Sequence, residues 1–180
     1  MSTPASIVLM AAYNASMNQK LYAAATQLPH AELAADRKAF FGSILGTLNH
    51  LLAADSIWLR RFATHPAGFR ALAPLLELPM PSGLTQSFGD DLPSLLAHRQ
   101  RLDAIITQWA PQVGAADLAH AFEYQSMKGD TYRKHFGSVV MHFFNHQTHH
   151  RGQASTLLSQ AGIDIGVTDL LVMVPELEAP

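Results

Sequence analysis

The segment from Ser43 to about Thr64 most constrains what this chain can fold into, because its apolar residues surround most of a helix. Nine apolar side chains share this segment: Ile44, Leu45, Leu48, Leu51, Leu52, Ile57, Trp58, Leu59 and Phe62. A helix that is apolar on nearly every side is buried against more than one neighbour. The segment therefore predicts a multi-helix domain with this helix in its interior.

Three further segments have helical periodicity. Residues 5–28 carry apolar residues at spacings of three, four and seven, and Pro29 closes them. Residues 92–110 follow a cap at Asp90 or Asp91, and the last helix runs from about 133 to about 161, before a terminating glycine. The sequence thus predicts four long helices.

The connections between these helices are long. Residues 65–90 are rich in proline and glycine, and a crossover of this length would leave the helices on either side of it roughly parallel. Alternation around a glycine-containing turn predicts a small hairpin over 117–133. We therefore expect one all-α domain over residues 1–180, a four-helix bundle with long inter-helix connections and a small β-hairpin before the last helix. Residues 163–180 form a loosely packed tail in this prediction, with a short helical turn around 168–173.

Composition excludes several classes of protein. The chain has 180 residues, 48% hydrophobic and 14% charged, which is typical of a soluble globular protein. A net charge of −2 with scattered lysines and arginines argues against a nucleic-acid partner. The absence of cysteine removes disulfides, thiolate ligands and cysteine nucleophiles. No apolar stretch is long enough to span a membrane, so we expect a cytoplasmic protein with no membrane partner.

Histidines concentrate near the C-terminus. Residues 142–153 contain four of the ten histidines. His146 and His150 lie four apart and face the inner side of a helix, where two imidazoles can share a metal ion. His149 points outward on the same wheel, and His142 lies at the margin. The alternative is that the inward pair are hydrogen-bonded core residues. No glutamate follows the first histidine, so the metalloprotease pattern His-Glu-x-x-His is absent.

His50 is the natural third ligand, because it lies in the buried helix beside small residues that leave room for an ion. Three neutral imidazoles with an open fourth position are typical of a catalytic metal site. Imidazole ligands suit zinc, nickel, copper or iron(II).

Other polar residues of the predicted bundle also require partners. Asp55 lies in the same buried helix as His50, and we predict that it forms an ion pair with Arg151. The alternative is that Arg151 extends to solvent. Further candidates for the surroundings of the metal are Tyr13, Asn14, Asn49, His142 and Gln147. These residues could equally be ordinary polar residues of helix surfaces. Because none of the polar candidates is a strong general base, a metal-bound water or thiolate would supply the nucleophile.

Two stretches together resemble the DinB family of metalloproteins. They run from Gly42 to Phe62, around His50, and from Phe144 to Gln153, and the similarity extends to Tyr13-Asn14. The resemblance implies a four-helix bundle with a three-histidine metal site, which maps onto His50, His146 and His150. Related members include thiol-dependent transferases and isomerases that use bacillithiol or mycothiol, and many members form dimers.

From the residues and the resemblance we expect a metal-dependent enzyme of the thiol transferase or hydrolase type. It would act on a small molecule, for which a low-molecular-weight thiol is one candidate, with nickel or zinc as the metal, and would form a homodimer. The alternative is a metal-binding stress or regulatory protein without catalytic activity.

Overall fold

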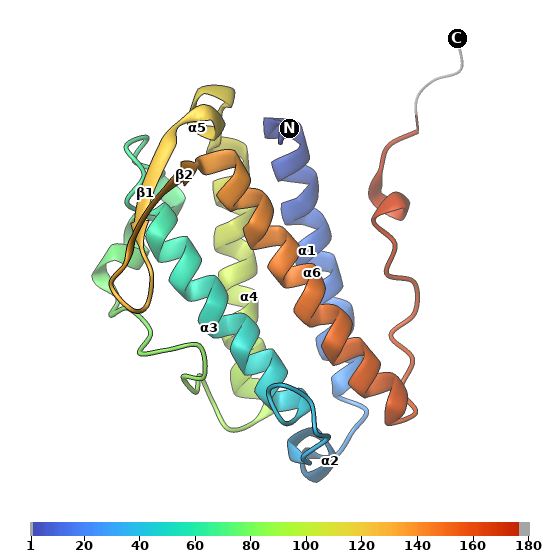
Figure 1. The fold of residues 1–180 in the computed structure, drawn as a ribbon. Helices are drawn as coiled ribbons and strands as arrows, with labels where there is room; N and C mark the ends of the chain where they lie inside the picture. Colours follow the sequence, from blue (N-terminus) through green and yellow to red (C-terminus); the bar gives the residue numbers. More distant parts are fainter. Residues whose placement is uncertain (1, 177–180) are drawn as a thin grey trace.

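The structure is a computed structural model that describes residues 2–176, and it confirms the predicted helical bundle (Figure 1). Its four long helices are α1 (Pro4–Ala25), α3 (Ile44–Phe62), α4 (Leu92–Trp109) and α6 (Phe136–Gln160). Helices α1 and α3 each pack against both α4 and α6. This arrangement encloses α3 from two sides, as its apolar circumference predicts.

Side-chain caps fix where three of the long helices begin. Thr3 accepts a hydrogen bond from the Ser6 amide at the start of α1. Ser43 caps α3 at 3.0 Å, and Asp91 caps α4 at 2.8 Å. Each cap satisfies a backbone N–H that has no partner within the helix.

The connection between α3 and α4 crosses the length of the bundle. Figure 1 shows α3 and α4 running in the same direction, with α1 and α6 running in the opposite one. The connection includes the 3₁₀ helix η1 (Arg70–Glu77), which anchors it through the buried side chains of Leu72 and Leu75. The predicted crossover is thus present, and part of it is helical.

Shorter elements complete the chain. Strands β1 (Ala121–Gln125) and β2 (Thr131–His135) form the hairpin, with Ala121 opposite His135. Strand β2 reaches His135, so α6 begins at Phe136 instead of near residue 133 as predicted. The remaining elements are short helices: α2 (His30–Ala34), η2 (Ala110–Gln112), α5 (Ala115–Ala119) and η3 (Leu170–Met173).

The segment after α6 has no buried residue within 163–176, and hydrogen bonds attach it to α1. The Tyr13 hydroxyl donates a hydrogen bond to the carbonyl of Thr168 at 2.6 Å, and Lys20 donates to Val167 at 2.8 Å. Ile163 and Ile165 pack against the core. These contacts hold the segment beside α1 up to η3, whereas residues 177–180 of the predicted tail lie outside the described residues.

Candidate metal centre

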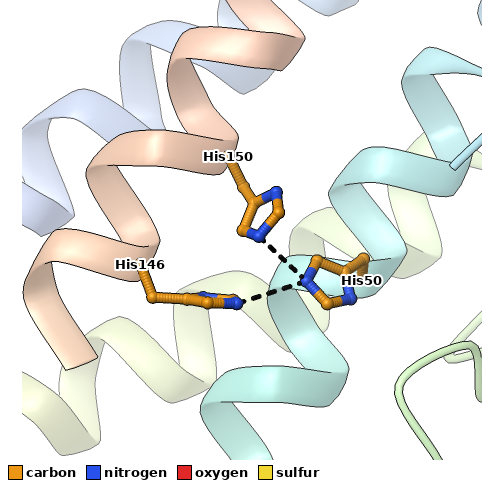
Figure 2. Close-up of side chains that lie close together, drawn as sticks. All are labelled: His50, His146 and His150. Carbon is orange, nitrogen blue, oxygen red and sulfur yellow. Dashed lines mark hydrogen bonds between the residues drawn. The ribbon is translucent and has the colours of Figure 1, made fainter. Parts of the chain in front are cut away.

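The bundle brings together the three histidines that were predicted as ligands. His50 projects from α3, and His146 and His150 project from adjacent turns of α6 (Figure 2). The Nε2 atom of His50 lies 3.4 Å from Nε2 of His146 and 3.3 Å from Nε2 of His150. One nitrogen of each ring lies within 4.8 Å of the other two. The three side chains therefore converge on one point between two helices.

Hydrogen bonds on the far side of two rings set their orientation. His50 Nδ1 lies 3.1 Å from the Leu84 carbonyl, and His150 Nδ1 lies 2.7 Å from Oε1 of Gln153. Both partners are acceptors, so each Nδ1 carries the proton and each Nε2 presents a lone pair. A partner of this kind is the usual way in which proteins orient a metal-binding imidazole.

Burial keeps these imidazoles neutral. Burial lowers the pKa of His50 to about 4, because desolvation penalises the charged ring more than the Leu84 hydrogen bond stabilises it. Burial, followed by repulsion from His150 and His50, lowers the pKa of His146 to about 3. The pKa of His150 is lowered in the same direction by burial. A neutral imidazole is the protonation state that binds a metal.

The donor set fits a divalent transition metal. Two imidazole nitrogens bound tetrahedrally to zinc at about 2.0–2.1 Å lie roughly 3.3–3.4 Å apart. The two Nε2 separations from His50 have this value. Without a cation, the lone pairs on His50 and His150 would repel each other at this distance. The structure thus shows a group of histidines that could hold a metal ion, and their chemistry leaves the identity of that ion open.

The sequence analysis missed three neighbours of the site, Phe41, Leu84 and Gln153. The ring of Phe41 stacks on His50 with centroids 3.8 Å apart. Leu84 contributes through its backbone carbonyl, which any residue type could supply. Gln153 was the one with a detectable pattern, since it lies one helical turn after His150.

Asn49 attaches the long connection to the site. Its side-chain amide donates to the Gln86 carbonyl, and its oxygen accepts a hydrogen bond from the Phe88 amide at 2.7 Å. The same stretch of chain supplies the Leu84 carbonyl to His50. Asn49, predicted to be near the metal, thus contacts the loop that orients a ligand.

The other polar candidates lie in different surroundings. His142 is exposed, with its ring 6.0 Å from that of His146 and 5.3 Å from that of Trp58. Gln147 is fully buried in α6. Tyr13 and Asn14 face α6, α4 and the C-terminal segment: Tyr13 binds Thr168, and Asn14 binds Asp103 and Arg151.

The predicted ion pair between Asp55 and Arg151 is wrong. Asp55 instead binds Arg99 of α4 at 2.6 Å, with both side chains buried, and Arg99 also faces Asp103 at 3.0 Å. Because α3 packs against α4 as well as α6, an inward carboxylate on α3 has two possible partner helices. Arg151 donates to the neutral amide of Asn14.

No helix within residues 2–176 is long and apolar enough to cross a membrane.

None of the curated proteins and none of the solved structures matches the chain. The sequence model of the DinB family does match, and it covers residues 1–176. The two stretches that resemble the family are the ones that supply the three converging histidines. The chain therefore belongs to the DinB family.

Proposed function

We propose that this protein is a metal-dependent enzyme that acts on a small molecule at His50, His146 and His150. The single observation that carries the proposal is the convergence of the three Nε2 atoms. Nickel or zinc is the metal that we propose, since imidazole nitrogens suit both. Three protein ligands leave a coordination position for a water or a substrate thiol.

The chain's own residues would hold and orient that metal. The Leu84 carbonyl and Gln153 keep the Nε2 lone pairs of His50 and His150 directed at one point. Phe41 covers one face of the His50 ring and limits access of water from that side. When bound, a divalent metal lowers the pKa of a coordinated water or thiol and so supplies a nucleophile at neutral pH.

Transfer to or from a low-molecular-weight thiol and hydrolysis are the two reaction types that we propose. Neither requires a strong general base from the protein, because the metal itself activates the nucleophile. The long connection between α3 and α4 contacts His50 through Leu84, which favours an enzyme over a metal-binding protein without catalytic activity.

Incubation of the metal-loaded protein with a panel of thiols, electrophiles and hydrolysable esters tests this proposal. We expect product formation that requires the metal and is abolished in His150→Ala. Stoichiometric metal without turnover on the panel would favour the alternative, a metal-binding stress or regulatory protein. Turnover that persists in His150→Ala would contradict the proposed site.

A further inference from the structure

A cavity lies on another side of α6 from the histidines. It has a volume of about 130 Å³, is partly open to solvent, and is lined by α1, α6 and the C-terminal segment. A water molecule takes up roughly 30 Å³ in the liquid, so the cavity has room for a small polar group. The residues of its wall that matter here are Tyr13, Arg151, Gly152 and Thr168.

Arg151 supplies the charge of this cavity. Its side chain is 6% exposed, and no carboxylate oxygen among residues 2–176 lies within 4.0 Å of its guanidinium. Two carboxylates of the neighbouring network have other partners: Asp103 is bound by Asn14, Asn18 and Arg99, and Asp55 is bound by Arg99. A buried cation normally has a counter-charge.

The guanidinium of Arg151 also has N–H groups that make no hydrogen bond within residues 2–176. It carries five N–H groups. Nη1 donates to Asn14, and Nη2 makes a long contact of 3.4 Å to Thr148 Oγ1. Within the described part of the chain, Nε makes no hydrogen bond. The Nε–Nη2 edge of an arginine is the edge that binds a carboxylate or phosphate with two parallel hydrogen bonds.

Gly152 lines the cavity and, because it has no side chain, leaves open space beside Arg151. It lies in the middle of a helix, where glycine is less favourable than alanine. A Cβ atom built on it would meet no atom within 4 Å. Packing against a neighbouring element therefore does not explain this glycine, whereas access to the cavity beside Arg151 does.

We propose that this cavity binds a small oxyanion, either a carboxylate group or a tetrahedral anion such as phosphate, on the guanidinium of Arg151. The site is separate from the metal centre, although the two share α6. Arg151 follows His150 in sequence, but successive side chains of a helix point about 100° apart. The C-terminal segment forms one wall of the cavity and is held there by the hydrogen bond from the Tyr13 hydroxyl to the Thr168 carbonyl.

Titration of the full-length protein with sodium phosphate, sulfate or acetate tests the proposal, with sodium chloride at matched ionic strength as the baseline. Isothermal calorimetry and thermal denaturation are the readouts. We expect saturable binding of at least one of the three oxyanions, and a rise in Tm beyond that in chloride. Comparison of acetate with phosphate and sulfate decides between a planar carboxylate and a tetrahedral anion.

Two variants address the cavity itself. Arg151→Gln should weaken the binding at least about tenfold, because charge-assisted hydrogen bonds are lost. Gly152→Leu retains the arginine and adds bulk at a position with free space, so it should fold and also weaken binding. If Arg151→Gln does not fold, Gly152→Leu alone tests whether the oxyanion binds in this cavity. Arg101→Gln, which removes an exposed arginine of α4, should leave binding unchanged.

His146→Ala separates this site from the metal centre. Oxyanion binding that survives in His146→Ala supports the cavity even if the proposed metal function fails. Binding that disappears in this variant would assign the anion to a metal ion and overturn the proposal. The absence of saturable binding in the wild type, or unchanged binding in both cavity variants, would also overturn it.

Discussion

Two groups of polar side chains between the packed helices of this bundle differ in their charge. Imidazoles gather between α3 and α6, where burial keeps them neutral. Charged groups gather between α3 and α4, where Asp55 and Arg99 neutralise each other. Separation of the two groups leaves the histidine nitrogens free of strong hydrogen-bonding competitors.

Asp55→Ala should lower the free energy of unfolding by about 3 kcal/mol, because it leaves Arg99 buried without its closest partner. The loss lies at the lower end of the usual range, since Asp103 still faces Arg99. Urea denaturation measures the change. Asp36→Ala removes a carboxylate from an exposed pair and should leave the midpoint unchanged. A loss under about 1 kcal/mol for Asp55→Ala would argue against a buried pair.

The burial of His65 predicts that the stability of the protein depends on pH. Its side chain is 4% exposed, with its ring 4.4 Å from that of Phe136, and burial followed by repulsion from His120 lowers its pKa. Below about pH 6.5 the unfolded chain therefore binds a proton that the folded chain does not, so stability falls as pH falls.

His65→Phe should reduce this dependence. Urea denaturation at several pH values between 7.5 and 5, with a chelator present, gives the slope for each protein. The wild type should lose stability more steeply toward acid than His65→Phe. Equal slopes would show that His65 is not held neutral by burial.

Sequence reasoning was reliable for single residues where a pattern pointed to one partner. His146 and His150 share a helix face at a fixed spacing, and the structure places them together with His50. Asp55 had no such pattern: its partner, Arg99, lies 44 residues away on a different helix. Which of two packed helices supplies a countercharge depends on their rotation, and periodicity alone does not determine that rotation.

At the scale of elements, the two glycines of α6 have opposite environments. A Cβ on Gly137 would lie 3.0 Å from the Leu118 carbonyl of α5, whereas a Cβ on Gly152 would meet nothing within 4 Å. We expect Gly137→Ala to lose about 1–2 kcal/mol through crowding. Gly152→Ala should gain up to about 1 kcal/mol through helix propensity. Thermal and urea denaturation measure the change in stability of each variant, and the two changes should have opposite signs. Changes of the same sign would contradict this packing of α5 on α6.

The connection between α3 and α4 should depend on Asn49. Asn49→Ala removes the hydrogen bonds to Gln86 and Phe88, which lie beside the carbonyl that orients His50. We expect faster hydrogen exchange across residues 84–88 and a metal affinity about 10–100-fold weaker. Asn145→Ala, on the exposed side of α6, is the matched control and should change neither. Unchanged exchange in Asn49→Ala would show that other contacts hold this loop.

Long helices were predicted from sequence because periodicity, caps and prolines mark their ends. Asp91, one of the two predicted positions, caps α4, and Ser43, where the apolar segment was predicted to begin, caps α3. The short helices α2 and α5 were not predicted, because five residues are too few to show a period. The start of α6 was displaced because β2 extends through His135, where pairing with Ala121 overrides local helix propensity.

For the whole molecule, topology explains why two distant stretches of sequence form one site. The crossover between α3 and α4 leaves α3 packed against the last helix, so His50 meets His146 and His150. The bundle and the three histidines could be predicted from motifs spread along the chain. The cavity at Arg151 could not, because it depends on where the C-terminal segment lies against α1.

The central claim, that these three histidines form one metal site, is tested most directly by the metal content of three proteins. Native mass spectrometry and elemental analysis would compare the wild type, His50→Ala and His149→Ala. We predict stoichiometric nickel or zinc in the wild type and in His149→Ala, whose exposed ring lies outside the converging group, and none in His50→Ala. Stoichiometric metal that survives in His50→Ala would contradict the account.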